Sequence, residues 1–149
     1  MITIRPSQMS DIHDLGILWN KMHSEELGPG VVSDYLFWEL VVGQAIHSNK
    51  DFVCFIAIDD DSPVGFIMGN RYYEPSDSRI HGISQHIYVL PEYRNTGTAM
   101  RLYRSLAKTF KTLGVQVISL YCLPARTSFW IRKGFKPVQT MFSKELKHD

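Results

Sequence analysis

The stretch HIYVLPEYRNTGTA, residues 86–99, decides how this chain folds. It begins with an apolar segment typical of a buried strand, and a helical pattern starts directly after it. The junction from Arg94 to Ala99 consists of small and polar side chains that pack a core poorly. A helix N-terminus carries unpaired backbone N–H groups and about half a positive charge. The junction is therefore a candidate site for an anion such as phosphate.

The side chains of the junction fit this hypothesis. Gly97 has no side chain to block a ligand, Thr96 and Thr98 add hydroxyl donors, and Arg94 adds a positive charge. The alternative is an ordinary loop before a helix, with Thr96 as its N-cap. A single glycine turn fits both interpretations.

Hydrophobic periodicity and turn residues predict the elements on both sides of the junction. Helices are expected from Ser10 (as N-cap) to about Ser24, after an N-cap at Ser33, at 100–113, and at 125–133. Strands are expected at 2–5, 51–59, 64–73, 82–90, 115–123 and 135–146. Segment 115–123 is almost entirely apolar, which predicts a strand buried on both faces. The strand–helix–strand unit at 82–123 predicts a right-handed crossover between parallel strands.

Length and composition predict one domain over residues 1–149, with 44% hydrophobic residues. No apolar run approaches the roughly 20 residues of a membrane helix, and the N-terminus lacks the pattern of a signal peptide. Cys54 and Cys122 lie in separate apolar runs without metal-ligand spacing. We expect two buried, free thiols in a reducing compartment, and thus a cytoplasmic protein without a metal site.

Charge is distributed unevenly along the chain, although the net charge is only +1. Residues 1–92 hold thirteen Asp and Glu against five Lys and Arg, and no carboxylate lies between Glu92 and Glu145. The asymmetry indicates that a polyanion binds the second part of the chain. The alternative is that the two parts neutralise each other in the fold, and charge alone does not decide.

Two motifs resemble those of a known family. Residues 91–99, PEYRNTGTA, resemble the acyl-CoA signature of the GNAT superfamily of N-acyltransferases, with Arg94, Gly97 and Ala99 at the matching positions. Residues 128–135, SFWIRKGF, resemble the family's closing helix. The resemblance implies an α/β (α+β) fold with a mixed, mostly antiparallel sheet of six to seven strands. Its fourth and fifth strands would be parallel and splayed apart, with helices flanking the sheet.

The resemblance also implies that acetyl-CoA is the cofactor. Its pantetheine arm would lie along the fourth strand, and its diphosphate would bind the amides of Arg94 to Met100. The amide of Val89 would polarise the thioester carbonyl. The residues predicted to contact the cofactor are Ile87, Tyr88, Val89, Arg94, Asn95, Thr96, Gly97, Thr98, Ala99, Met100, Arg101 and Trp130.

The catalytic positions depart from the family pattern. No carboxylate occupies the usual base positions, so the candidates are Gln85, as a water holder, and the histidines His81 and His86. Because His86 points to the opposite face of an ideal strand from Gln85, its use requires a bulge. Trp130 occupies the position of the family's acidic tyrosine, and Tyr121 is the candidate substitute.

The leading interpretation is an acetyl-CoA-dependent N-acetyltransferase acting on a primary amine of a small molecule or a protein. The alternative is a catalytically impaired CoA-binding module with a regulatory or interaction role. A nucleic-acid binder is disfavoured because the aromatic residues look buried, and no membrane partner is expected. The final strand would permit a homodimer. The acidic residues expected to face a cationic amine are Glu25, Glu26, Asp34 and Glu39.

Overall fold

A five-stranded sheet forms the centre of the protein in a computed structural model, which describes residues 1–28 and 35–148. The strands are β1 (Ile2–Pro6), β2 (Phe52–Asp59), β3 (Ser62–Glu74), β4 (Arg79–Val89) and β5 (Val117–Leu120). The helices are α1 (Ile12–Leu27), α2 (Tyr35–Ser48), α3 (Thr98–Thr112) and α4 (Thr127–Arg132). Short 3-10 turns are η1 (Met9–Asp11), η2 (Pro91–Tyr93) and η3 (Pro124–Arg126).

The strands lie in chain order, and only the last pair is parallel. Antiparallel pairing joins β1 to β2, β2 to β3 and β3 to β4, whereas β4 and β5 run parallel. The β2–β3 hairpin turns at Asp60 and Asp61, both with positive φ, as a tight turn requires. The predicted mixed sheet and its parallel pair are confirmed.

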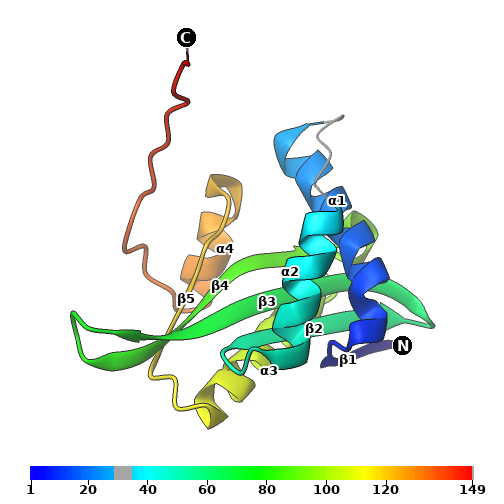
Figure 1. The fold of residues 1–149 in the computed structure, drawn as a ribbon, viewed down its shortest axis with the longest axis horizontal. Coiled ribbons are helices and arrows are strands. Elements are labelled where there is room, and N and C mark those ends of the chain that lie inside the picture. Colours follow the sequence, from blue (N-terminus) through cyan, green and yellow to red (C-terminus); the bar gives the residue numbers. More distant parts are fainter. Residues whose placement is uncertain (29–34, 149) are drawn as a thin grey trace.

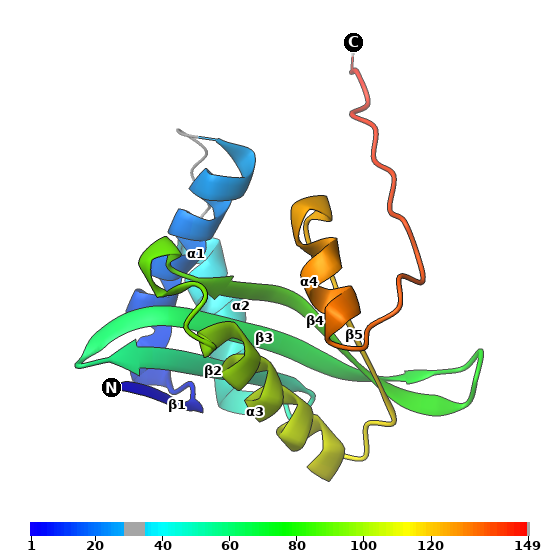
Figure 2. The same cartoon turned by 180° about the vertical axis from the view of Figure 1, so that it is seen from behind.

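Helices cover both faces of the sheet. Figure 1 shows α1 and α2 on one face, and Figure 2 shows α3 crossing the other face. Leu102, Leu106 and Phe110 of α3 recur at four-residue spacing and are buried against the strands. Gly82 of β4 permits this close packing, because a Cβ there would lie 2.5 Å from the Phe110 ring.

Two strand predictions are wrong. The described residues form five strands rather than six to seven, because segment 135–148 has no assigned strand or helix. The C-terminal tail, as we call residues 136–148, leaves the body beyond α4 in an extended form (Figures 1 and 2). In addition, β5 spans only Val117–Leu120 and is half-buried rather than buried on both faces. Among the described strands it pairs only with β4, so it lies at the edge of the sheet.

Smaller corrections concern helix starts and cysteines. Ser10 does not cap α1, because the 3-10 turn η1 contains it and α1 begins at Ile12. The proposed cap Ser33 lies outside the described residues. Both cysteines are free, as expected, but only Cys54 is buried, and burial raises the pKa of its thiol to about 12. Cys122 is exposed because it follows the end of β5.

Candidate active site

A β-bulge in β4 shapes the centre of the site. Met68 of β3 pairs with His86, whereas the next residue, Gly69, pairs with Ser84, so Gln85 is an extra residue on β4. The extra residue breaks the alternation of faces, and Gln85 and His86 both line one cavity. The bulge that the use of His86 requires is therefore present.

The parallel ladder between β4 and β5 ends at this bulge. Its last backbone bond runs from the Tyr121 N–H to the Ser84 carbonyl, at 3.0 Å. From Gln85 to Val89, β4 has no pairing with β5 in the described parts of the chain. One edge of β4 is thus open at the point where the family resemblance would place the pantetheine arm.

Val89 directs its backbone groups to this open edge. The Leu90 N–H donates to the Val64 carbonyl of β3 at 2.9 Å, and ladder bonds alternate along an antiparallel pair. Leu90 and Tyr88 therefore bond to β3, while Val89 and Ile87 face the other way. In agreement, the Val89 carbonyl accepts a bond from Arg94 Nε at 2.9 Å.

The loop between β4 and α3 presents a run of unpaired amides. Pro91 begins the short turn η2, Asn95 and Gly97 have φ of 63° and 83°, and α3 begins at Thr98. Among the described residues, no acceptor is found for the backbone N–H groups of residues 95–100. An added Cβ at Gly97 would meet nothing within 4 Å. The loop is therefore open at residues 95–100, but not at the predicted Arg94 amide, whose N–H donates to the Pro91 carbonyl at 3.2 Å.

The hydroxyls of this loop are used differently from the prediction. Thr96 Oγ1 donates to the Tyr93 carbonyl and lies 2.8 Å from Thr98 Oγ1. Thr98 is almost fully buried. These side chains hold the loop in shape rather than extend donors toward solvent, so a contact from either hydroxyl to an anion stays a prediction.

Arg94 binds a carboxylate of α1. Its Nη1 lies 2.6 Å from Oε1 of Glu25, and its Nη2 donates to Oε2 at 2.8 Å. The Tyr88 hydroxyl also donates to Glu25, at 2.9 Å. The bond from Arg94 holds the pKa of Glu25 below its usual value, while burial and the bond to Glu25 raise the pKa of Tyr88 to about 12. Arg94 therefore positions the loop with a charge that is already paired.

Arg101 and the other cations of α3 face solvent. Arg101 Nη2 donates to the Ile2 carbonyl of β1 at 2.9 Å. The remaining cations of this helix, Arg104, Lys108 and Lys111, are exposed. No ligand contact for Arg101 follows from this arrangement, and its predicted role stays a prediction.

A cavity of about 410 Å³ opens beside the bulge, between α1, α2 and the sheet. The described residues that line it are Trp19, His23, Trp38, Val41, Val42, Phe52, Met68, Gly69, Asn70, Gln85 and His86. Burial, with a smaller effect of His23, lowers the pKa of His86 to about 4. At neutral pH the His86 ring is uncharged, so one of its nitrogens can accept a hydrogen bond.

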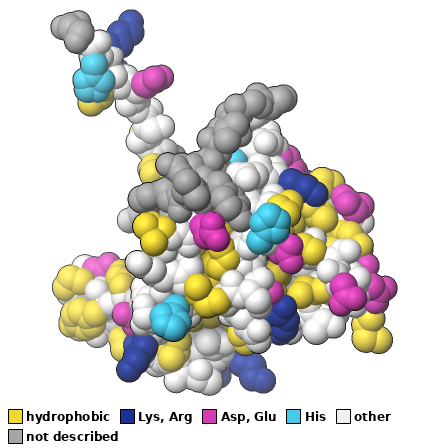
Figure 3. All heavy atoms as spheres, turned by 45° about the vertical axis from the view of Figure 1, so that its right-hand side comes forward, with side chains coloured by type: hydrophobic (Ala, Val, Ile, Leu, Met, Phe, Trp, Pro, Cys, Tyr) yellow, Lys and Arg dark blue, Asp and Glu magenta, His cyan; other side chains and the backbone are white. Residues whose placement is uncertain are grey.

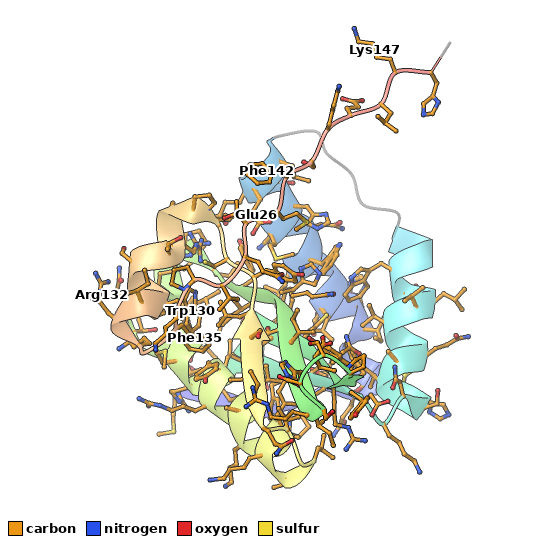
Figure 4. All side chains as sticks on the ribbon, turned by 90° about the vertical axis from the view of Figure 1, so that its left-hand side faces the viewer. Glu26, Trp130, Arg132, Phe135, Phe142 and Lys147 are labelled. Atoms are coloured by element: carbon orange, nitrogen blue, oxygen red, sulfur yellow. The ribbon has the colours of Figure 1, made fainter. Side chains whose placement is uncertain are left out.

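The other predicted groups lie elsewhere. His81 is at the far end of β4, where Nε2 lies 2.7 Å from Asp77 Oδ2. Tyr121 follows the last rung of the ladder, half exposed. Trp130 is buried, with its ring centroid 5.8 Å from Tyr103 and 5.4 Å from Phe135. Figure 4 shows Trp130 and Phe135 side by side at the base of α4. Trp130 packs α4 against α3 through its contact with Tyr103. A contact between Trp130 and the cofactor stays a prediction.

The acidic residues expected to face an amine do not line this cavity. Glu25 is bonded to Arg94 and Tyr88, and Glu26 is exposed. Glu39 borders a separate shallow hollow on α2, and Asp34 lies outside the described residues. Sequence reasoning instead missed three lining residues, Trp19, His23 and Trp38. The recurrence of aromatic rings at positions 19 and 23, one helical turn apart, was the available signal.

The described part of the chain contains neither a metal-binding cluster nor a membrane-spanning helix. Within residues 1–28 and 35–148, no group of three or more potential metal-binding side chains is found. None of the helices described there has the length and apolar character needed to cross a membrane.

Comparison with known proteins gives the family. The model of the acetyltransferase (GNAT) family matches residues 16–135. No curated protein is similar enough in sequence to match. Solved structures share the fold over nearly the whole chain at low identity. A predicted acetyltransferase with acetyl-CoA from Clostridium acetobutylicum is 16% identical with a TM-score of 0.83, covering 97% of this chain and 96% of that one.

Two further structures extend the likeness. A possible acetyltransferase from Clostridium difficile 630 is 18% identical, with a TM-score of 0.77 and 99% of each chain covered. An aminoglycoside acetyltransferase from an uncultured soil metagenomic sample, in complex with sisomicin, is 12% identical with a TM-score of 0.76, covering 98% and 97%. At these identities the likeness shows the fold, and the family model supplies the assignment. The chain belongs to the GNAT family of acetyltransferases.

Proposed function

We propose that this chain, as one domain over residues 1–149, transfers the acetyl group of acetyl-CoA to the nitrogen of a primary amine. The observation that carries the proposal is the continuity of two open backbone surfaces. The edge of β4 from Gln85 to Val89 lacks a β5 partner, and it leads directly to the unpaired amides of residues 95–100. An extended, anionic ligand fits this combination, with the anion on the amides and the arm along the strand.

The chain would act mainly by positioning and polarisation. Bound acetyl-CoA supplies an activated acetyl group as a thioester. The Val89 N–H, directed to the open edge, donates a hydrogen bond to the carbonyl oxygen of that group. Gln85 and the neutral ring of His86 hold the amine, directly or through water, in the adjoining cavity. A pKa of about 4 makes His86 a weak base, so its role is that of a hydrogen-bond acceptor.

We propose roles for three further residues. Tyr121, at the end of the ladder, is the proposed proton donor to the departing thiolate. Trp130 and Arg101 are proposed contacts of the cofactor. Because both cysteines are free, we also propose a reducing, cytoplasmic setting.

The test compares two glycines with similar backbone conformation. Gly97 has φ of 83° and Gly134 has φ of 93°, and an added Cβ meets nothing within 4 Å at either position. We expect Gly97→Glu to abolish acetyl-CoA binding in calorimetry, because the new carboxylate occupies the anion site. Gly134→Glu should show similar backbone strain and unchanged binding. Equal affinity of both variants and the unaltered protein would contradict the binding of an anion at the amides of residues 95–100.

A thiol-release assay separates the enzyme from its alternative, a CoA-binding module with impaired catalysis. Turnover with any primary amine supports the enzyme. Acetyl-CoA binding without turnover over a broad amine panel supports the module. The departures at Trp130 and at the usual base positions are what favour this second candidate.

We also propose that the protein forms a homodimer through the C-terminal tail. Val138, Phe142 and Leu146 are 79%, 89% and 70% exposed, and at four-residue spacing they would share one face of an extended strand. β5 pairs only with β4 among the described strands, which leaves its outer edge open. Figure 3 shows the tail standing away from the body of its own chain. A tail from a second copy would add a strand to this edge.

Light scattering on the full chain tests the dimer. We expect a dimer that Phe142→Asp dissociates, because the charge falls on the apolar face. Gln139→Asp, on the opposite face of the same segment, should leave the dimer intact. A monomer at all concentrations, with the tail folded on its own β5 or elsewhere, would rule this assembly out.

A further inference from the structure

The cavity beside the bulge has a continuous aromatic wall. The Trp19 ring centroid lies 4.6 Å from that of His23 and 4.5 Å from that of His86. The Trp38 ring lies 5.7 Å from Trp19 on the α2 side. Because these rings contact one another, they form one surface on which a flat or compact apolar group can lie.

The described lining of the same cavity contains no acidic, lysine or arginine side chain. Glu25, also on α1, is paired with Arg94 at 2.6 Å. An acceptor with several ammonium groups would lose hydration here and gain no ion pair among these residues, which is unfavourable.

We propose that this cavity selects a primary amine joined to a compact aromatic or branched apolar body. The body lies against Trp19 and Trp38, and the nitrogen reaches Gln85 and His86 at the end of the open β4 edge. The inference rests on the proposed function, because it names the acceptor of that reaction. A volume of about 410 Å³ fits such an amine, since sites for small organic molecules span roughly 300–1,000 Å³.

The reaction balances with acetyl-CoA as the only co-reactant. The amine nitrogen forms a bond to the acetyl carbon and loses a proton to water. The carbon–sulfur bond breaks, and its electron pair leaves with the sulfur as a thiolate that takes up a proton. The products are an N-acetyl amine and free CoA.

The first experiment compares two probes in the thiol-release assay with acetyl-CoA. 2-Phenylethylamine carries one amine on an aromatic body, and spermidine carries several amines on a flexible chain. We expect kcat/KM for 2-phenylethylamine to exceed that for spermidine at least tenfold. Equal values, or a preference for spermidine, would overturn the inference and leave the proposed function intact.

A matched pair of variants on α2 tests whether the amine binds in this cavity. Val41 lines the cavity and is 47% exposed, whereas its neighbour Leu40 is 59% exposed and borders the separate hollow. Both positions therefore accept a glutamate without disrupting the core. Val41→Glu should lower the preference for 2-phenylethylamine over spermidine about tenfold, because a carboxylate enters the apolar lining. Leu40→Glu should leave the preference unchanged, and equal effects of the two variants would contradict the assigned cavity.

A binding readout separates failure of the inference from failure of the proposed function. Trp19 and Trp38 line the cavity, so 2-phenylethylamine should change the tryptophan fluorescence saturably, with or without CoA, and less in Val41→Glu. Such binding in a protein that ignores acetyl-CoA would uphold the amine site and refute the transferase. Acetyl-CoA binding with no response to 2-phenylethylamine would refute the amine class alone.

Discussion

Arg94 and Glu25 form a two-pronged ion pair that ties the loop before α3 to the last turns of α1, with contacts of 2.6 and 2.8 Å. The two residues are 69 positions apart in the chain. Arg94 also bonds the Val89 carbonyl through Nε, so one side chain joins the loop, the open strand edge and the helix that borders the cavity beside the bulge. The proposed cofactor loop is therefore held in place before any ligand binds.

Removing the charge of Glu25 should loosen this loop. In Glu25→Gln, Arg94 keeps one acceptor but loses the ion pair, and the pair is partly exposed, so we expect a loss of about 1 kcal/mol in unfolding free energy. Because the loop must then be ordered on binding, the Kd for acetyl-CoA should rise about fivefold. Calorimetry and denaturant unfolding measure both. Glu26→Gln, at an exposed neighbouring position, is the control, and equal effects of the two variants would show that the pair does not organise the loop.

Adding one methyl group at two glycines should give opposite results. A Cβ at Gly82 would lie 2.5 Å from the Phe110 ring, which is fully buried, so Gly82→Ala should lower the unfolding free energy by about 2 kcal/mol. A Cβ at Gly43 of α2 would meet Met9 and Ile12 at ordinary contact distances of 3.6 and 3.8 Å. Gly43→Ala should therefore gain about 0.5–1 kcal/mol from helix propensity. Denaturant midpoints test both signs, and a neutral Gly82→Ala would contradict the close packing of α3.

Much of the fold could be predicted from local pattern. The spacing of Leu102, Leu106 and Phe110 predicts a helix with one buried face, and all three are buried. The polar junction after Leu90 predicts the loop whose amides are unpaired. Such features depend on residues close together in the chain, which is why a single sequence reveals them.

The rest depends on contacts between distant segments. The tail has apolar residues at 138, 142 and 146, which would share one face of a strand, but a strand requires an edge to pair with, and the local pattern cannot supply that edge. Likewise, Trp19 looks like an ordinary core residue until α2 brings Trp38 within 5.7 Å of it. Glu25 looks like a free surface carboxylate until the fold places Arg94 beside it.

Neutralising Asp11 should lower the unfolding free energy far more than neutralising an exposed carboxylate. It is 5% exposed, and it accepts bonds from Arg5 at 2.7 and 2.8 Å and from the Gln8 N–H at 2.7 Å. Asp11→Asn leaves the Arg5 charge without its partner and turns an N–H group toward other donors, so we expect a loss of about 3 kcal/mol. Denaturant unfolding of this variant and of Asp61→Asn, on the exposed β2–β3 turn, gives the comparison. A cost below about 1 kcal/mol would mean that this ion pair does not stabilise the start of α1.

The pH dependence of the unfolding free energy should report the lowered pKa of His86. Its pKa falls from the model-peptide value of 6.5 to about 4 in the folded protein, mainly through burial. Above pH 6.5 neither state binds the proton. As the pH falls from 6.5 towards 4 the unfolded chain takes it up first, so stability decreases.

The shifted pKa of His86 should lower the unfolding free energy by about 2 kcal/mol as the pH falls from 6.5 towards 4, after allowance for the partial exposure of the ring. Unfolding free energies at pH 7.5, 6.5, 5.5 and 4.5 should show this loss in the unaltered protein. His86→Asn removes the titrating ring and should flatten that part of the curve, while His148→Asn, on the exposed tail, should keep it. An unchanged curve in His86→Asn would place the histidine ring in water rather than against Trp19. Its proposed role as a neutral hydrogen-bond acceptor for the amine would then be lost as well.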